Sequence, residues 1–405
     1  MSTPANDHGD ALARIRGSLM PARANARTVA AFTDNPGCTR RRVIDAARVK
    51  AYELADRLGY GATRGQSPFA ITTGNRFERR LKDGSGYALL ADVLRSFVDL
   101  PLDGLRLADV GRVRGYPLGD AMLEARARET DRVLSQIARG DANAPHIVDH
   151  PVLVFDVAGT RAFLEPDALA FRSGAKLELV EIKSYAIIDD QADPAKLAAT
   201  SGQVGVYYLA LRATLVRLGF SPDLLLPSYI LVTPKNFGRT PVGYRLPLRK
   251  KTTALERVLR AVPRTADVLA KIPATMTLDV DPGERMDPGR RRDALTDAVK
   301  ALPMLYVPEC LASCDMARFC RHEAVISDDP SRLGRAARDN LAGLHRLADA
   351  LRLANKGPGR GEEKLADVAA ALGLAAKALS RARTAAGMDE DPAPRSARSR
   401  ARGRA

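Results

Sequence analysis

The chain has 405 residues, of which 45% are hydrophobic, 5% are aromatic and 27% are charged. This length and apolar content allow one large folded domain or several smaller ones. The 63 Lys and Arg residues outnumber the 48 Asp and Glu residues, which leaves a formal charge of +15 and favours polyanionic partners. No apolar run reaches the roughly 20 residues that cross a bilayer, so a membrane span is excluded.

The first residues and the cysteines indicate the cellular compartment. Residues 1–27 are polar and contain no apolar segment of the kind that signal peptides carry. We therefore expect a cytoplasmic protein without membrane attachment. In that reducing compartment its four cysteines favour metal binding over disulfide formation.

Helical patterns dominate the first third of the chain. Residues 1 to about 27 are expected to be disordered or loosely attached. Beyond them, apolar residues recur at steps of three and four, the period of a helix with one buried face. This period and the glycine positions predict helices at 40–58, from 75 past 81, and at 120–138.

Between residues 150 and 250 the apolar pattern changes to alternation, which indicates strands. Strands are predicted at 152–157, 161–171 with an interruption at Pro166, 176–184, 228–233 and 244–248. Helices are predicted at 196–218, 253–269 and 293–301. The fold class is therefore α/β, with a mixed central sheet of meander strands flanked by helices.

The last fifty residues look like an appendage. Residues 357–361 are glycine-rich and predict a linker. Ala369, Gly373 and Leu379 have the spacing of a helix-turn-helix with glycine at the turn, and a plain helical hairpin is the alternative. From Pro392 to Ala405 there are five arginines and no acidic residue, a composition suited to non-specific phosphate contacts.

Two acidic residues and a lysine form the central chemical pattern. Asp167 follows a proline, and after thirteen intervening residues comes Glu181-Ile182-Lys183 on the next predicted strand. Alternation places Glu181 and Lys183 on one face, so two carboxylates can converge on one divalent ion beside an ammonium group. Mg²⁺ or Mn²⁺, a metal-bound water and a lysine are the parts that phosphodiester hydrolysis needs. The alternative is an ordinary ion pair on a strand.

Two polar residues follow on the next helix. Gln203 and Tyr207 are four residues apart, so they share one helical face that can point at the carboxylates. Ordinary helix packing explains the same spacing. Upstream, Glu78 lies on a predicted helix one residue after the apolar Phe77 and is by itself indistinguishable from a surface charge.

The cysteines suggest one metal centre. Cys310, Cys314 and Cys320 lie within eleven residues, and the fourth, Cys38, precedes them by 272 positions. Four thiolates suit a [4Fe–4S] cluster or a structural zinc ion, and the sequence does not decide between them. The remote Cys38 implies that the chain closes on itself.

In combination these residues resemble the RecB-type PD-(D/E)XK nucleases, and most closely the iron–sulfur branch that includes CRISPR-associated exonucleases. The order along residues 36–325 matches: Cys38 with Arg40, a helical acid, Asp, Glu-x-Lys, Gln-x3-Tyr and three late cysteines. The resemblance implies a RecB-like core with a cysteine-ligated cluster lobe. It implies a metal-dependent DNA exonuclease, acting on single strands or free ends in repair, CRISPR adaptation or phage defence, with a helicase or defence protein as partner.

The resemblance also assigns residue roles. It implies Glu78, Asp167 and Glu181 as metal ligands, Lys183, Gln203 and Tyr207 as further catalytic residues, and the four cysteines as cluster ligands. Many members have histidine where Glu78 stands, and His146 or His150 is an alternative. The late cysteines depart from the more usual spacing, and the chain lacks a phosphate-binding helicase motif.

The expected organisation has four parts: an N-terminal segment at 1–27, a nuclease core at 28–325 closed by the cluster, a helical extension at 326–356, and the appendage at 357–405. The rival interpretation is a DNA-binding regulator or adaptor that keeps the fold without cutting. The intact Asp167, Glu181 and Lys183 set favours the enzyme.

Overall fold

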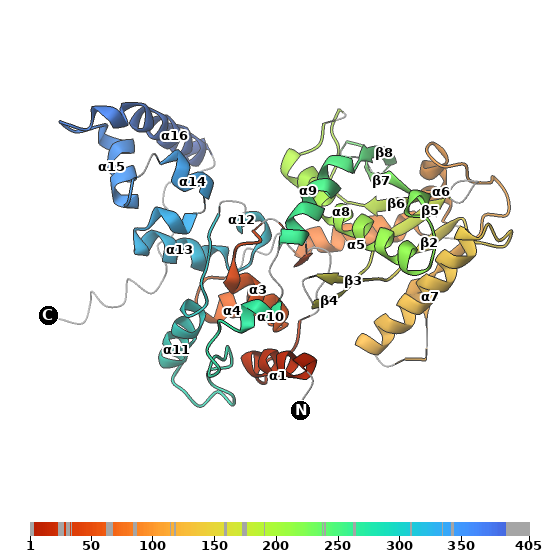
Figure 1. Cartoon of the computed structure of the whole chain (residues 1–405). Coiled ribbons are helices and arrows are strands. Elements are labelled where there is room, and N and C mark those ends of the chain that lie inside the picture. The colour runs from red at the N-terminus through yellow and green to blue at the C-terminus, as the bar shows by residue number, and fades with distance from the viewer. Residues whose placement is uncertain are drawn as a thin grey trace. The chain divides into compact units, whose positions relative to one another are not determined.

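A computed structural model describes most of the chain, which forms two compact units (Figure 1). Unit 2 contains residues 23–36 and 65–267, and unit 1 contains residues 1–22, 37–64 and 268–405. The described residues are 4–22, 28–29, 33, 35–61, 68–83, 87–113, 115–116, 119–157, 160–171, 176–189, 191–236, 238, 240–261, 265–307, 310–333, 335–341 and 344–385. This division differs from the expected single core at 28–325, because the segment with Cys38 and the segment with the late cysteines belong to unit 1.

Unit 2 is built on a six-stranded mixed sheet in the order β1-β2-β5-β6-β7-β8. The β1–β2 and β6–β7 pairs are parallel, and the other neighbours are antiparallel. A separate hairpin consists of β3 and β4. The strands are β1 (Leu107–Asp109), β2 (Ile147–Asp149), β3 (Leu153–Val157), β4 (Thr160–Leu164), β5 (Ala168–Phe171), β6 (Leu177–Ile182), β7 (Leu225–Pro234) and β8 (Pro241–Pro247).

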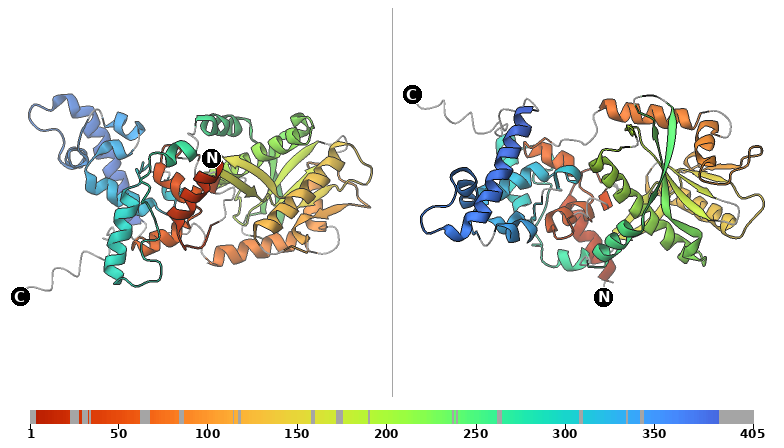
Figure 2. Two further views of the ribbon diagram at one scale, coloured as in Figure 1. Left: turned by 60° about the horizontal axis from the view of Figure 1, so that its bottom comes forward. Right: turned by 90° about the horizontal axis from the view of Figure 1, so that it is seen from above.

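Helices cover both faces of this sheet (Figure 2). One face packs on α5 and α6, with Ile182 and Ile230 in that core. The other face packs on α7 and α8, with Leu179 and Leu231 in that core. The helical elements of unit 2 are α5 (Pro68–Leu81), α6 (Ala88–Arg95), η1 (Val110–Arg112), α7 (Asp120–Ala138), α8 (Pro194–Arg217), η2 (Pro222–Leu224) and α9 (Arg249–Ala261), while α10 (Thr265–Leu269) spans the unit boundary.

In the described residues of unit 1 the regular elements are all helices, and its core joins segments from both ends of the chain. Ile15, Ile44 and Leu54 share this core with Val299 and Phe319. The elements are α1 (Pro4–Arg16), α3 (Thr39–Ala46), α4 (Ala51–Arg57), α11 (Pro288–Lys300), α12 (Cys310–Ser313), α13 (Ala317–Ser327), η3 (Pro330–Leu333), α14 (Arg335–Asn340), α15 (Leu347–Lys356), η4 (Glu363–Leu365) and α16 (Ala366–Ala385).

The predicted strands and the mixed sheet are confirmed, with boundaries shifted by a few residues. The sequence patterns missed α6, β1 and β2, because short elements carry little periodicity. The single helix expected at 40–58 is two helices, since Arg48 adopts a left-handed backbone (φ 58°) between them. The apolar alternation at 152–171 does not form one meander with β6, because β3 and β4 pair only with each other.

Both ends of the chain differ from the expectation. The disorder expected at 1–27 is wrong for Pro4–Arg16, which forms α1 and buries Ile15 in the core of unit 1. The predicted helix-turn-helix is also wrong, because α16 continues through Gly373 without a turn. Helix α16 packs against α15, so a helical hairpin is present instead. Among the described helices, none has the length and apolarity needed to cross a bilayer. The arginine-rich tail from Pro392 lies outside the described residues.

Candidate functional site

The register of β5 and β6 brings Asp167 and Glu181 together in unit 2. Ala168 pairs with Val180 in this antiparallel ladder, so Asp167 lies beside the end of β6. The Asp167 carboxylate accepts a hydrogen bond from the Ile182 amide at 2.7 Å. Alternation places Glu181 on the same sheet face as Leu179, the face that α8 covers. The two carboxylates therefore meet where the sheet and α8 adjoin.

Burial disfavours the charged forms of these two carboxylates. Glu181 is only 1% exposed, and its Oε2 atom has no hydrogen-bond partner among the described residues. Burial and then the charge of Asp167 raise the pKa of Glu181 to about 8, against the opposing effect of Lys183. Burial also raises the pKa of Asp167. A divalent cation between the two carboxylates would relieve both the repulsion and the missing contact, so the residues fit Mg²⁺ or Mn²⁺.

Lys183 extends this pair as the alternation predicted. It follows the end of β6, and its ammonium forms an ion pair with the Glu181 carboxylate. Burial opposes the charge on Lys183, but attraction to Glu181 and Asp167 outweighs it and raises the pKa to about 12. Lys183 is therefore a fixed cation at the edge of the carboxylate pair, and its side chain remains 24% exposed.

Gln203 and Tyr207 reach the same place from α8. The Gln203 amide donates to the Tyr207 hydroxyl at 2.8 Å, and that hydroxyl donates to the Glu165 carbonyl at 3.0 Å. Burial raises the pKa of Tyr207 well above its usual value, and the charges of Glu181 and Asp167 raise it further. Because Tyr207 is buried, it acts on the chain segment that carries Asp167 rather than on a solvent-facing molecule.

Glu78 approaches from α5 on the other side of the sheet. The charge of Glu78 raises the pKa of both Asp167 and Glu181, which places it near the carboxylate pair. A hydrogen bond from His150 and the charge of Lys82 overcome burial and lower the pKa of Glu78 to about 2. Glu78 is thus an ionised third carboxylate.

The two histidine alternatives separate in the structure. The His150 ring contacts Glu78, with Nε2 at 3.2 Å from Oε1. The His146 ring contacts Arg106 instead, through its Nδ1 atom at 3.0 Å from the backbone amide and its Nε2 atom at 3.1 Å from the guanidinium. His150 therefore joins Glu78, whereas His146 belongs to the β1–β2 edge.

Sequence reasoning missed the residues behind Glu78. Lys82 and Asp149 form an ion pair of 2.7 Å beneath it, and the ligand atoms of Asp109, Asp149 and His150 lie within 4.8 Å of one another. The only available signal was an acidic residue within the apolar run of β2. Lys82 gave none, since it stands in a charged stretch typical of a helix end.

The four cysteines collect in unit 1. Cys38 precedes α3, Cys310 begins α12, Cys314 follows it, and Cys320 lies in α13. Burial raises the pKa of the Cys320 thiol to about 12, and the neighbouring charges of Cys38 and Cys314 contribute. Burial likewise raises the pKa of Cys314, with Cys310 as a neighbour. The thiols therefore interact electrostatically in pairs, Cys320 with Cys38 and Cys314, and Cys314 with Cys310.

A buried arginine and a half-buried one accompany the thiols. Arg40 is 1% exposed and donates to Cys320 Sγ at 3.2 Å and to Glu323 at 2.7 Å. Arg41 interacts with Cys314 in the same way and forms an ion pair with Asp45. Cationic donors to sulfur stabilise thiolates, the form in which cysteines bind metals.

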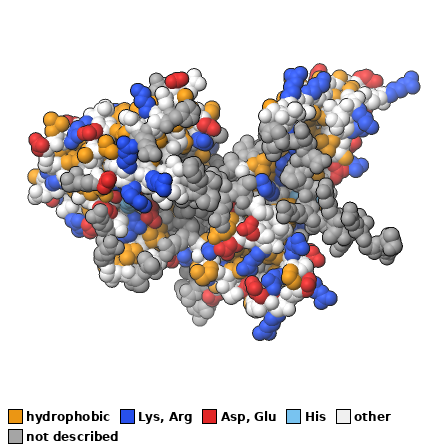
Figure 3. Space-filling view, turned by 180° about the vertical axis from the view of Figure 1, so that it is seen from behind, with side chains coloured by type: hydrophobic (Ala, Val, Ile, Leu, Met, Phe, Trp, Pro, Cys, Tyr) orange, Lys and Arg blue, Asp and Glu red, His pale blue; other side chains and the backbone are white. Residues whose placement is uncertain are grey.

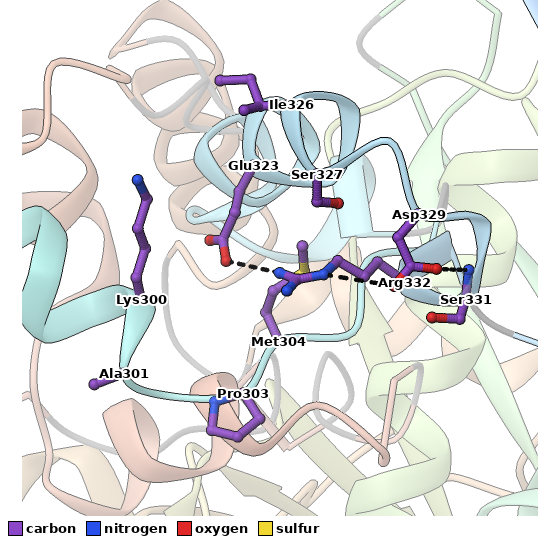
Figure 4. Close-up of a pocket in the computed structure, with 10 residues that line it drawn as sticks. All are labelled: Lys300, Ala301, Pro303, Met304, Glu323, Ile326, Ser327, Asp329, Ser331 and Arg332. Atoms are coloured by element: carbon purple, nitrogen blue, oxygen red, sulfur yellow. Dashed lines mark hydrogen bonds and ion pairs between the residues drawn. The ribbon is translucent and has the colours of Figure 1, made fainter. Parts of the chain in front are cut away.

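A cavity of 610 Å³ lies in unit 1 and shares no residue with the carboxylate pair (Figure 4). Its wall contains Lys300, Met304 and Glu323. In Figure 4 the Arg332 side chain reaches toward Glu323, with which it forms an ion pair of 3.1 Å. Because Glu323 also binds Arg40, this cavity borders the cysteine lobe rather than the site in unit 2.

On the face seen in Figure 3, basic side chains do not form a single continuous patch. Figure 3 shows Lys and Arg side chains with acidic ones between them across the face in view. In unit 2 the helix α9 is strongly basic, with Arg249, Lys250 and Lys251 in its first turn. Lys251 packs over Gly202 of α8, where a Cβ atom would lie 3.4 Å from its Cε atom. This contact holds a cation one residue away from Gln203.

Comparison with known proteins gives only distant similarity. No protein-family model and no curated protein sequence matches the chain. A crystal structure from Eubacterium rectale, described as a "putative exonuclease", covers 67% of this chain and 87% of its own, with 12% identity and a TM-score of 0.29. The crystal structure of SSO0001 covers 44% of this chain and 87% of its own, with 14% identity and a TM-score of 0.17. At these TM-scores the similarity carries no functional argument.

Proposed function

We propose that unit 2 is a divalent-metal-dependent nuclease that hydrolyses phosphodiester bonds of DNA, as the RecB-type resemblance implies. The observation that carries this proposal is the pair of buried Glu181 and half-buried Asp167, with Lys183 at its edge. Two repelling carboxylates, one with an unpartnered oxygen, cost the fold stability unless they serve a ligand. A hard divalent cation is the ligand that fits oxygen donors of this kind.

Each residue of the candidate site has a role in this proposal. Asp167 and Glu181 would hold the cation, with Glu78 as the third carboxylate. The cation would supply a Lewis acid for the phosphate and a bound water of lowered pKa. Lys183 keeps its proton and stabilises the negative charge that develops on the phosphate oxygens. Tyr207, held by Gln203, fixes the Glu165 carbonyl and thereby the segment leading to Asp167.

We propose DNA as the substrate, as single strands or free ends. The basic helix α9 supports this choice, because Lys251 lies beside the first half of α8, from which Gln203 reaches the site. Lysines at such a position neutralise phosphates without reading sequence. Exonuclease action, a role in repair, CRISPR adaptation or phage defence, and a helicase or defence protein as partner rest on the resemblance alone.

For unit 1 we propose a [4Fe–4S] cluster bound by Cys38, Cys310, Cys314 and Cys320. The buried neighbouring thiols and the Arg40 hydrogen bond to Cys320 fit a thiolate-bound centre. Structural zinc is the less favoured occupant of the same ligands. In either case the centre would tie the segment at Cys38 to α12 and α13 and would take no part in hydrolysis.

The decisive variant is Lys183→Ala. It removes the ammonium but keeps both carboxylates, so Mn²⁺ and DNA should still bind. Cleavage of end-labelled single- and double-stranded DNA should fall at least about 10²-fold, because the lost charge acts mainly in the transition state. Lys176→Ala, on the same strand segment but outside the site, is the matched control and should cleave like the wild type. Cleavage by Lys183→Ala at the wild-type rate would refute the catalytic assignment.

The second candidate is a DNA-binding protein that does not cut. Its support is that Lys183 already forms an ion pair with one carboxylate oxygen of Glu181. This candidate predicts that the wild type binds DNA but releases no labelled product with either Mg²⁺ or Mn²⁺. The same assay therefore separates the two functions.

A further inference from the structure

Behind Glu78 lies a buried network that none of the roles above uses. The Lys82 ammonium contacts Glu78 Oε1 at 2.5 Å and Asp149 Oδ1 at 2.7 Å. His150 contacts the same two carboxylates, with Nε2 at 3.2 Å from Glu78 Oε1 and Nδ1 at 2.9 Å from Asp149 Oδ2. The Tyr87 hydroxyl donates to Asp149 Oδ2 at 2.9 Å. Two side chains thus bridge a buried carboxylate to Glu78.

The base of this network is deeply buried. The Asp149 side chain is 1% exposed and the Lys82 side chain 8% exposed, whereas Glu78 is 28% exposed. Lone buried charges are costly, so Asp149 and Lys82 require each other and hold one geometry. Glu78, at the more exposed end, receives its position from them.

The same residues also fix Asp167 through its backbone. The Asp167 carbonyl accepts hydrogen bonds from Lys82 Nζ and from the His150 amide, both at 3.3 Å. His150 has a left-handed backbone (φ 46°), and Arg126 donates to its carbonyl at 2.9 Å. A non-glycine residue keeps such a conformation only where its surroundings enforce it. The network therefore sets the distance between Glu78 and the segment that carries Asp167.

A second metal site is the obvious alternative reading of Asp109, Asp149 and His150. Their ligand atoms are close enough, within 4.8 Å of one another. However, the Lys82 ammonium already contacts Asp149 from within this group. A metal ion there would have to displace a buried lysine that has carboxylate partners, so the arrangement fits a support better than a cation site.

We infer that Lys82 and His150 are positioning residues that hold Oε1 of Glu78 and the backbone of Asp167, so that Oε2 of Glu78 is presented to the metal. This inference rests on the proposed function, because it assigns Glu78 to the same metal as Asp167 and Glu181. Both contacts fall on one oxygen of Glu78. Metal ligands commonly have such supporting partners, and their loss weakens metal affinity.

A Mn²⁺ titration of the full-length, metal-depleted protein without DNA tests this. The signal of free aqueous Mn²⁺ in electron paramagnetic resonance gives the dissociation constant. Lys82→Met and His150→Asn should each weaken Mn²⁺ binding by roughly 10- to 100-fold. Lys176→Met repeats the lysine substitution away from the site and should bind Mn²⁺ like the wild type.

A double-mutant cycle separates positioning from general support of the fold. In a Glu78→Gln background, Lys82→Met and His150→Asn should cost clearly less Mn²⁺ affinity than in the wild type, since only their contacts to the Asp167 backbone still act on a metal ligand. If Lys82→Met does not melt cooperatively, His150→Asn carries the test, because it leaves the Lys82–Asp149 pair in place.

Two results would overturn the inference. One is wild-type Mn²⁺ affinity in His150→Asn and in folded Lys82→Met. The other is an equal loss of affinity with and without the Glu78 carboxylate, which would indicate general damage to the fold. Failure of the proposed function has a different signature, because Asp167→Asn would then also leave Mn²⁺ binding unchanged.

Discussion

The carboxylate site of unit 2 and the cysteine site of unit 1 are assembled in opposite ways. The first is mostly local: Asp167, Glu181 and Lys183 come from β5, β6 and the residues flanking them, and Gln203 and Tyr207 come from the next helix. The second joins Cys38 to cysteines about 270 positions later. Strand pairing places the carboxylates, whereas the packing of the two chain ends places the thiols.

This difference suggests a chemical role for the site in unit 2 and a structural role for the site in unit 1. The site in unit 2 contains carboxylates that repel each other. Such repulsion costs stability and is typical of functional sites. The thiols of unit 1 lie in an apolar core with Met316 and Phe319, and their charged neighbours are arginines that offset thiolate charge. The comparison holds if each site can be disabled without the other.

The largest effect is expected from Asp167→Asn. The substitution keeps the side-chain volume but removes a charge that we propose binds the metal, so Mn²⁺ binding and DNA cleavage should be lost together, the latter by about 10³-fold or more. The iron and sulfide content of anaerobically purified protein should stay at the wild-type level. If Asp167→Asn also lost its iron, the two sites would not be independent.

Cys320→Ser tests the cysteine site of unit 1. Anaerobically purified wild-type protein should be brown, with about four iron and four sulfide ions per chain for a cubane cluster. The variant should lose that colour and melt at a lower temperature, since the proposed centre would link α13 to the segment at Cys38. A colourless wild type with one bound zinc ion would refute the cluster and leave the four-ligand site.

The contrast also explains what the sequence could predict. Alternation along β6 was sufficient to place Glu181 beside Lys183, and a four-residue step placed Gln203 beside Tyr207. Periodicity records which face of an element a residue occupies, so it serves well within a strand or a helix. The neighbourhood of the cysteines followed from their count and from resemblance, not from periodicity.

The residues that support Glu78 could not be predicted in this way. Lys82 stands at the end of a basic helix, where lysines are usually solvated, and its burial depends on β2, some 65 positions later. Asp149 lies in a strand of three residues, too short to give a pattern. Their partnership is a property of tertiary packing, which local propensity does not record.

A prediction of intermediate size concerns the pH dependence of protein stability, to which Glu181 in the site of unit 2 should contribute. In metal-free protein the pKa of Glu181 is raised from 4.5 to about 8 by burial and by Asp167. The folded state then binds more protons than the unfolded state between these values, so its stability should fall as pH rises from about 5 to 8. Thermal melts in chelator should show this decline.

Glu181→Gln is the matched variant for that measurement. It removes the titrating group, so the decline between pH 5 and 8 should flatten, while cleavage is lost. Added Mn²⁺ should restore wild-type stability at pH 8, because a cation offsets the repulsion between the carboxylates. A decline of equal size in Glu181→Gln would assign the pH dependence to other groups with a raised pKa, such as Asp167 or His150.

The smallest effect is expected from Lys251→Ala, which asks whether unit 2 contributes its own contacts to DNA. Lys251 extends over Gly202 on α8, close to Gln203 but outside the carboxylate pair. If its ammonium neutralises one phosphate, the salt dependence of DNA binding should lose about one unit of slope, with a similar loss of affinity for every sequence. The cleavage rate at saturating DNA should not change, because no group at the reacting phosphate is altered.

Lys176→Ala removes an equal charge elsewhere on unit 2 and should leave the slope as it is. Equal slopes in Lys251→Ala and the wild type would exclude α9 from the DNA path and leave DNA binding to other basic segments.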